Sequence, residues 1–353
     1  MAPGYQPTFF AKVDPLKSPL SAQLKLRLET NLPPAHIIRG RVLDTEKQPI
    51  EGAVVSVEMV QQGNTGHGTP PNGTDPIAVT DEAGNFAIQS MEAFDSMQLR
   101  VDARGYARRD VNDVAGGKPV EFVVVRGAAV KGRVLRDGNP MQDVTIGLVS
   151  VDRSMGNFTG EFLIGTTESG SFVLPNIPPN REYYLYGTMG SLKGGTLPAK
   201  RIKVGADNSV FEAGTLTVTP GLHLSGEVKL ASNEPIPPGT KVVVSLDEAW
   251  DSAVAPAAPD GHFEFTNLPP GKVTVSTRIE GFRLSRLNPS LDQLNPSSLT
   301  GKLVSDRTNF VILLERGTSL PSDYSNTEDR PGESPLASVG EKRVVAGAKT
   351  FPK

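Results

Sequence analysis

The sequence has no cysteine among its 353 residues. Disulfide bonds, thiolate catalysis and cysteine-based zinc sites are therefore excluded. The absence fits either a reducing compartment or an exported bacterial protein that is stabilised by core packing alone. Histidine is scarce too, with four residues, and none of them lies in a helix-spaced ligand pair or a His-Glu-x-x-His motif. We therefore expect neither a metal site nor a cofactor.

Long apolar runs are also absent. No stretch is long enough to span a bilayer, and the N-terminus lacks the basic region and apolar stretch of a signal peptide. The formal net charge is -3 and the pI is near 5.9, which argues against a nucleic-acid partner. The sequence has no Gly-x-Ser-x-Gly elbow. The glycine-rich segment 63–68 lacks the ending of a phosphate-binding loop, and we interpret it as a flexible insertion between strands.

Glycine and proline, in contrast, are abundant, with 36 and 30 residues. Because they are spread between short apolar runs, they indicate many turns and an all-β protein. One turn occurs three times, with a phenylalanine two residues after a glycine. Glycine takes positive φ at little steric cost. Each copy therefore predicts a tight turn followed by a strand that begins with a buried phenylalanine. The three copies are Gly84-Asn85-Phe86, Gly170-Ser171-Phe172 and Gly261-His262-Phe263.

A second pattern, apolar-x-Gly-x-Val, opens each repeat. Its glycines are Gly40, Gly132 and Gly226, which lie 92 and 94 residues apart. This period is the size of a small β-sandwich and exceeds that of a solenoid repeat. The sequence thus predicts a tandem array of three β-sandwich domains with very short connections, so neighbouring domains should touch. The predicted domains are residues 36–127, 128–220 and 221–317, followed by a tail, 318–353, whose composition is that of a disordered segment.

Residues 1–35 parallel the end of a repeat. Ala2-Pro3-Gly4-Tyr5 resembles Ala103-Arg104-Gly105-Tyr106, and the alternating segment 24–28 resembles the last strand of a unit. We expect the chain to start inside a fourth, upstream repeat, either as a fragment or through a start codon placed too late. Both would explain the missing signal peptide. The alternative is a short natural strand that pairs with the first domain.

Aromatic residues supply the candidate ligand site. Strict alternation predicts that Tyr183 and Leu185 point into the second core, with Tyr184 and Tyr186 on the other face. Trp250, the sole tryptophan, lies in a loop between strands. Exposed rings on a sandwich can stack on a sugar or anchor a partner. The alternative is that Trp250 plugs the end of its own sandwich and that the tyrosines pack on an adjacent domain.

Several phrases resemble the carboxypeptidase regulatory-like family, also called carboxypeptidase D regulatory-like. They are Gly-Arg-Val at 40–42 and 132–134, Pro-Ile-Glu-Gly-Ala-Val-Val at 49–55, Thr-Asp-Glu-Ala-Gly-Asn-Phe at 80–86 and Ala-Arg-Gly-Tyr at 103–106. The resemblance covers residues 36–317, and it is strongest in the first unit and weakest in the third. It implies prealbumin (transthyretin)-like sandwiches of about seven strands. Such modules are non-catalytic accessories of peptidases, outer-membrane receptors or bacterial surface proteins, and no phrase here carries a catalytic residue.

The function we expect is a non-catalytic, extracytoplasmic scaffold, adhesion or spacer module of a bacterial envelope protein. The reason is that a scaffold is repeated without a convergent polar site. One alternative is carbohydrate binding through Trp250 or the pair Tyr184 and Tyr186. Another is a regulatory segment of a larger peptidase or outer-membrane receptor. An intrinsic hydrolase would need a polar cluster assembled across a domain junction. The sequence does not specify the protein or polysaccharide partner.

Overall fold

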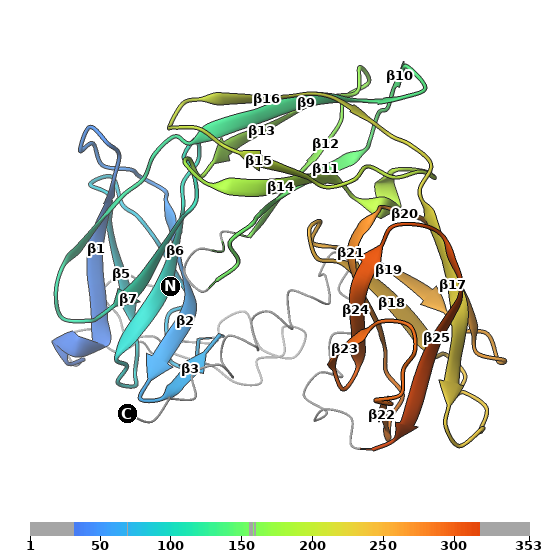
Figure 1. Ribbon diagram of the computed structural model, residues 1–353. Coiled ribbons are helices and arrows are strands. Elements are labelled where there is room, and N and C mark those ends of the chain that lie inside the picture. The colour runs from blue at the N-terminus through green and yellow to red at the C-terminus, as the bar shows by residue number, and fades with distance from the viewer. Residues whose placement is uncertain (1–31, 69, 155–157, 159, 318–353) are drawn as a thin grey trace, which may run out of the picture.

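A computed structural model describes residues 32–68, 70–154, 158 and 160–317 of the chain. Within these residues the structure has no α-helix, and its strands form six sheets. The sheets lie in three facing pairs, one pair in each third of the described chain (Figure 1). The prediction of an all-β array of three β-sandwiches is thus confirmed. Residues 1–31 of the expected upstream repeat and the expected tail, 318–353, lie outside the described residues.

Each sandwich is named by its place in the chain. The first contains the sheets β5-β1-β8 and β3-β2-β6-β7, with β4 also paired to β2. A short 3-10 helix, η2 (Pro34–His36), precedes this sandwich. The strands of the first sandwich are β1 (Ile37–Leu43), β2 (Val54–Gln62), β3 (Thr65–His67), β4 (Ile77–Val79), β5 (Asn85–Gln89), β6 (Ser96–Asp102), β7 (Arg109–Val114) and β8 (Val120–Val123).

The second sandwich contains the sheets β10-β9-β13, with β16 also paired to β9, and β12-β11-β14-β15. A 3-10 helix, η3 (Met189–Ser191), follows β14. The strands of the second sandwich are β9 (Ala128–Arg136), β10 (Asn139–Pro140), β11 (Thr145–Ser150), β12 (Glu161–Gly165), β13 (Ser171–Ile177), β14 (Glu182–Gly187), β15 (Lys200–Lys203) and β16 (Val210–Thr217).

The third sandwich contains the sheets β20-β17-β25-β22 and β19-β18-β21-β24-β23. Its strands are β17 (Leu222–Leu230), β18 (Lys241–Leu246), β19 (Asp251–Pro256), β20 (His262–Leu268), β21 (Gly271–Thr277), β22 (Phe282–Leu284), β23 (Asp292–Asn295), β24 (Ser298–Leu303) and β25 (Arg307–Arg316).

The two repeated sequence patterns meet across a strand pair. Gly40 lies opposite Phe86, Gly132 opposite Phe172, and Gly226 opposite Phe263. In the first two sandwiches the phenylalanine ring lies over the glycine, because a Cβ on Gly40 or Gly132 would come within 2.7 or 2.8 Å of that ring. In the third sandwich the Cβ of residue 226 would instead meet the backbone of Phe310.

The turn glycines are needed for two reasons. Gly84, Gly170 and Gly261 have φ values of +76°, +73° and +90°, a region that favours glycine. Each also lies against the carbonyl oxygen of the valine in the opening strand. A Cβ would come within 2.6, 2.5 and 2.2 Å of the carbonyl oxygens of Val42, Val134 and Val228, respectively. The turn and the opening strand therefore fix each other in all three copies.

The cores agree with the predicted alternation. Leu99 and Val101 are buried in the first sandwich, and Val273 and Val275 in the third. Tyr183 and Leu185 are buried in the second, among the residues of its own core cluster.

The last long strand of each sandwich pairs in parallel with the first. β8 lies beside β1, β16 beside β9, and β25 beside β17, all in the same direction. The chain therefore enters each sandwich at one end and leaves it at the opposite end.

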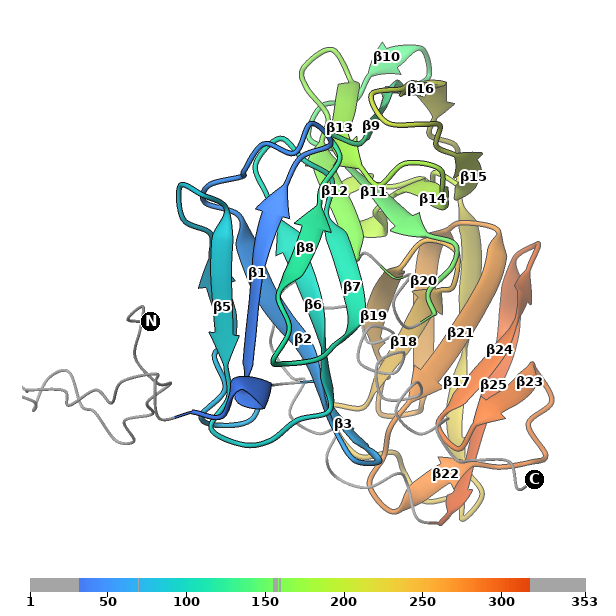
Figure 2. The same ribbon diagram turned by 90° about the vertical axis from the view of Figure 1, so that its left-hand side faces the viewer.

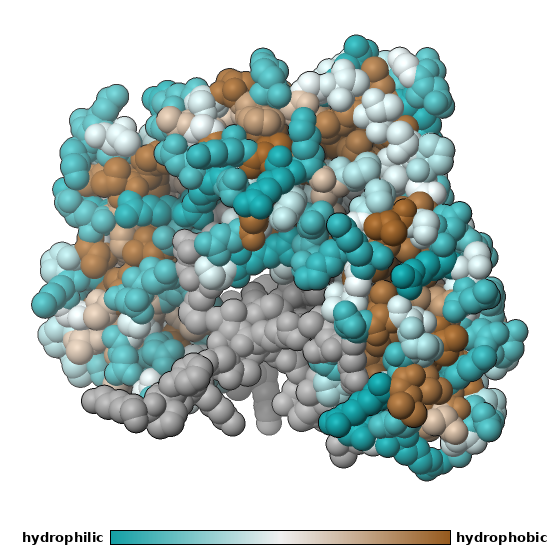
Figure 3. Space-filling view, viewed as in Figure 1, coloured by the Kyte–Doolittle hydropathy of each residue, from teal (hydrophilic) through white to brown (hydrophobic). Residues whose placement is uncertain are grey.

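The three sandwiches form an arch in which the second lies across the top of the other two (Figure 1). A view from the side of the first sandwich places its sheet β5-β1-β8 outermost, with the other sheet behind (Figure 2). On the face shown in Figure 3, apolar residues reach the surface in separate groups among hydrophilic ones.

One local interpretation differs from the structure. Residues 65–67, inside the segment interpreted as a flexible insertion, form β3, which pairs with Val60–Gln62 of β2. Gly63 permits the hairpin because its φ is +58°, and its N–H donates to Oδ2 of Asp95 at 2.6 Å. Gly63 therefore serves a tight turn and Gly66 lies within β3, so this part of the segment is a hairpin and not a loose loop.

Candidate functional site at the junction of the second and third sandwiches

The three predicted aromatic site residues come together at one place, the junction of the second and third sandwiches. Tyr184 and Tyr186 lie on the face of β14 opposite Tyr183. Tyr186 is 0% exposed, and with Val149 of β11 it belongs to the same apolar cluster as the core of the third sandwich. Tyr184 and Trp250 are partly buried against this cluster. The tyrosines thus turn away from their own core, and the neighbouring sandwich packs on them.

A glycine makes room for the buried tyrosine. Gly147 of β11 lies opposite Tyr186 of β14, and a Cβ at this position would come within 2.4 Å of the tyrosine ring. The ring therefore lies flat over β11, where any side chain would displace it. The sequence signal was a glycine inside an otherwise apolar strand, a pattern that marks close approach of another group, and it was missed.

Trp250 connects the two sandwiches through its ring. The centroid of the Phe158 ring, from the segment between β11 and β12, lies 5.1 Å from that of Trp250. The guanidinium carbon of Arg153 lies 4.7 Å from the same centroid, which is within range of a cation–π contact. Trp250 itself has a φ of +43°. Its loop conformation thus turns the ring toward the second sandwich.

Ligand binding by Trp250, Tyr184 and Tyr186 stays a prediction. Stacking on a sugar needs an open ring face. Tyr186 offers none, since it is fully buried, and Arg153 lies over one face of Trp250. A sugar on that face of Trp250 would have to displace the guanidinium.

Asp251 carries a hydrogen bond across the junction. The backbone N–H of Met189, in η3 of the second sandwich, donates to Oδ2 of Asp251 at 2.7 Å. The N–H of Ser252 donates to Oδ1 at 2.8 Å. Burial raises the pKa of Asp251, and these two N–H donors oppose that shift.

Glu161 is the second carboxylate of the junction. The hydroxyl of Tyr186 donates to its Oε1. Burial, and to a smaller extent the negative charge of Asp251, raise the pKa of Glu161 to about 7 against the opposing positive charge of Arg153. Burial in turn lowers the pKa of Arg153. The junction therefore encloses two carboxylates and one guanidinium among aromatic rings. Both carboxylates accept hydrogen bonds from the chain itself, Glu161 from Tyr186 and Asp251 from Met189 and Ser252.

At the junction of the first and second sandwiches, the linker residue Gly127 bonds to the second sandwich. Gly127, with a φ of +84°, donates its N–H to Oδ1 of Asp207 at 2.5 Å and accepts from the N–H of Asn208 at 2.8 Å. A Cβ on Gly127 would lie 2.8 Å from the carbonyl oxygen of Ile177. In addition, the guanidinium carbon of Arg108 in the first sandwich lies 5.9 Å from the centroid of the Phe162 ring.

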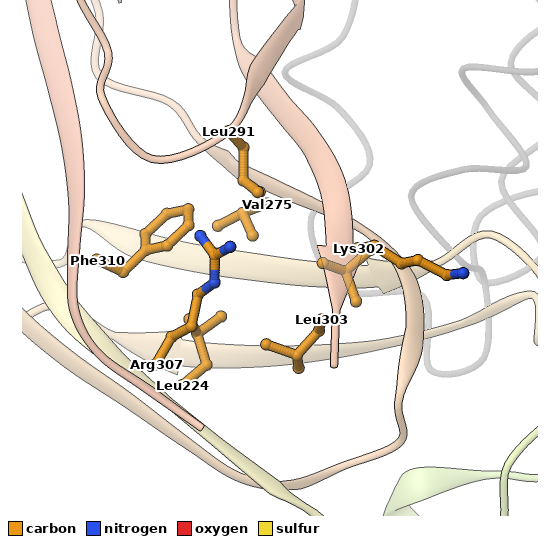
Figure 4. Close-up of a pocket in the computed structure, with 8 residues that line it drawn as sticks. Leu224, Val275, Leu291, Lys302, Leu303, Arg307 and Phe310 are labelled. Atoms are coloured by element: carbon orange, nitrogen blue, oxygen red, sulfur yellow. The ribbon is translucent and has the colours of Figure 1, made fainter. Parts of the chain in front are cut away.

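Other chemistry is limited in the part of the chain that the structure describes. Those residues contain no group of three or more histidine, aspartate or glutamate side chains that could hold a metal ion, and no helix among them is long and apolar enough to cross a membrane. A small apolar cavity opens into the third core beside Leu224, Leu291 and Phe310, while Lys302 points away from it (Figure 4). Its volume of about 10 Å³ is room for one water.

Comparison with known proteins supports the resemblance for the first sandwich. Residues 37–125 match the model of the carboxypeptidase regulatory-like domain family. For the second and third sandwiches, the resemblance rests on the repeated motifs described above. A search of curated proteins gave no match.

The solved structures that the chain resembles include bacterial pilins. "The Bacillus anthracis TIE protein" is 14% identical, with a TM-score of 0.22; the match covers 80% of this chain and 50% of that one. The chain thus spans about half the length of that protein. A streptococcal ancillary pilin is 11% identical, with a TM-score of 0.28, and the match covers 80% of this chain and 99% of the pilin. BcpA, the major pilin subunit of Bacillus cereus, is 10% identical, with a TM-score of 0.21 and coverage of 80% and 99%. At such scores the whole chains do not superimpose, and the likeness does not bear on function.

Proposed function

We propose that the chain is a non-catalytic scaffold or adhesion module that holds its two ends at a fixed distance and angle. In this proposal residues 36–127, 128–220 and 221–317 are the three domains, and the protein acts outside the cytoplasm on a bacterial envelope. The observation that carries the proposal is the shared apolar cluster of the second and third sandwiches, which includes the buried Val149 and Tyr186.

Two features favour fixed junctions over freely jointed ones. The connections are short, since β8 ends at Val123 and β9 begins at Ala128, while β16 ends at Thr217 and β17 begins at Leu222. Each junction also has its own hydrogen bonds, to Asp207 in one and to Asp251 in the other. Relative motion of domains is expected unless the interface between them is large and apolar. A fully buried aromatic side chain and a polar cluster at the second junction oppose such motion.

Distance measurements between spin labels test this proposal. The chain has no cysteine, so a spin label attaches only at an introduced cysteine. In the double variant Thr45→Cys and Ser232→Cys, one label lies on an exposed turn of the first sandwich and the other on an exposed turn of the third. Ser232→Cys with Lys302→Cys, both within the third sandwich, gives the distribution width of a rigid body. We expect the two widths to be similar, and we expect Trp250→Ala to broaden only the pair that spans the sandwiches. A broad distribution in the unaltered background would refute the fixed-spacer role.

The location can be tested separately. Fractionation of the source bacterium should recover the protein with periplasmic, cell-surface or secreted markers and apart from a cytoplasmic marker. Recovery with the cytoplasmic marker would contradict the extracytoplasmic part of the proposal and leave the spacer part standing.

A further inference from the structure

Glu161 occupies a place where the three sandwiches meet. It is the first residue of β12, and its neighbours Gly160 and Phe162 face Arg108 of the first sandwich. Its own side chain faces the junction with the third sandwich, where Tyr186 donates to it. The charged and titratable groups around it come from every element packed there. They are Arg153 after β11, Tyr184 and Tyr186 of β14, Asp247 and Asp251 around Trp250, and Arg108 on the first-sandwich side.

The charge balance of this cluster changes with one proton. When Glu161 and Asp251 are both ionised, Glu161 faces a like charge, Asp251, and an opposite charge, Arg153, in a half-buried space. Arg153 also faces Asp247, which forms an ion pair with Lys272. Uptake of a proton by Glu161 removes its repulsion with Asp251. It also removes a charge whose burial is unfavourable.

We propose that the junction of the second and third sandwiches is a proton-dependent clamp, closed more tightly when Glu161 is protonated and loosened when it is ionised. This goes beyond the scaffold role, which needs no response to pH. The tightness of this junction would then depend on the pH around the protein.

The direction follows from linkage. In the closed junction the pKa of Glu161 is raised from its ordinary 4.5 to about 7, whereas an opened junction exposes the side chain to water and restores the ordinary value. The closed state therefore binds the proton more tightly than the open state. Closure is strongest below about pH 5 and weakens as pH rises toward about 7, by at most about tenfold in equilibrium constant per pH unit. Solvent reaching the half-buried side chain reduces that slope.

Hydrogen exchange at one amide measures this equilibrium. The N–H of Met189 is bonded to Asp251 across the junction, so its protection, corrected for the intrinsic exchange rate, reports closure. In the full chain we expect protection to fall between pH 5 and 7 and then level off. In Glu161→Gln it should stay high near pH 7, and the dependence that remains at lower pH belongs to Asp251. Glu168→Gln, an exposed position in the turn at the other end of β12, should keep the unaltered profile.

A second variant keeps the test decisive if Glu161→Gln unfolds the second sandwich. Tyr186→Phe removes the hydroxyl that favours the ionised carboxylate, so the fall in protection should move to higher pH. Iodide quenching of Trp250, the sole tryptophan, should follow the same profiles. A flat profile in the unaltered protein, an unchanged profile in Glu161→Gln, or no shift in Tyr186→Phe would each overturn the clamp.

Discussion

Replacing Gly84 by alanine tests whether the repeated turn is fixed by contact or only by backbone conformation. Gly52 is a matched position in the same sandwich, because its φ of +73° is close to the +76° of Gly84. The two glycines differ in their surroundings. A Cβ on Gly84 would lie 2.6 Å from the carbonyl oxygen of Val42, whereas a Cβ on Gly52 would meet nothing within 4 Å.

The magnitude can be worked from these two differences. Positive φ costs an alanine about 1–2 kcal/mol, and the smaller freedom of its unfolded chain returns about 0.4–1 kcal/mol. Gly52→Ala should therefore lower the free energy of unfolding by about 1 kcal/mol. Gly84→Ala adds the displacement of a strand carbonyl, an overpacking term of about 1–3 kcal/mol. The expected loss for Gly84→Ala is thus about 2–4 kcal/mol.

Hydrogen exchange by mass spectrometry in the full chain resolves this effect by sandwich. Peptides from β1 and β5 should exchange faster in Gly84→Ala than in Gly52→Ala, and peptides from the third sandwich should not change. Equal losses in the two variants would show that the Val42 carbonyl accommodates the new methyl group. The contact would then not be what fixes the turn.

Three further predictions concern other positions. Gly147→Ala should push the ring of Tyr186 out of the junction and raise iodide quenching of the tryptophan, while circular dichroism shows the strands retained. Burial raises the pKa of Asp75 to about 6, so the folded protein binds this proton more tightly than the unfolded chain does. The free energy of unfolding of the first sandwich should therefore fall as the pH rises from about 4 to 6. In Asp75→Asn that fall should be smaller, as measured by urea titrations. Thr80→Val should lower the free energy of unfolding of the first sandwich by about 2 kcal/mol or more, measured in the same titrations, because the buried Thr80 hydroxyl donates to Ile50 and accepts from Ala53.

The architecture could be predicted because its signals are local and repeated. A glycine with positive φ followed by a core phenylalanine depends on neighbouring residues, so the turns at Gly84, Gly170 and Gly261 could be identified from the sequence. The pairing of Gly40 with Phe86 was not predicted, although both patterns had been identified. Their separation of 46 residues carries no local signal for which strands become neighbours.

The junction shows where the sequence stops being informative. Alternation placed Tyr184 and Tyr186 on the outer face of their sheet, but the identity of the group covering that face depends on how two domains dock. Glu161, Arg153 and Asp251 resemble ordinary surface residues in the sequence. Asp251 joins the other two only because β19 of the third sandwich packs against η3 of the second, which brings its charge close to Glu161. Gly147 was the one local sign of a ring lying over β11.

The parallel pairing of first and last strands has a mechanical consequence. A pull applied to the two ends of a sandwich acts along β1 and β8, or along the corresponding pairs β9 and β16, β17 and β25, in opposite senses. The hydrogen bonds between the two strands then bear the load together, in shear, and do not break one after another. Each sandwich should thus resist unfolding most strongly when the force runs between its two ends, along its first and last strands.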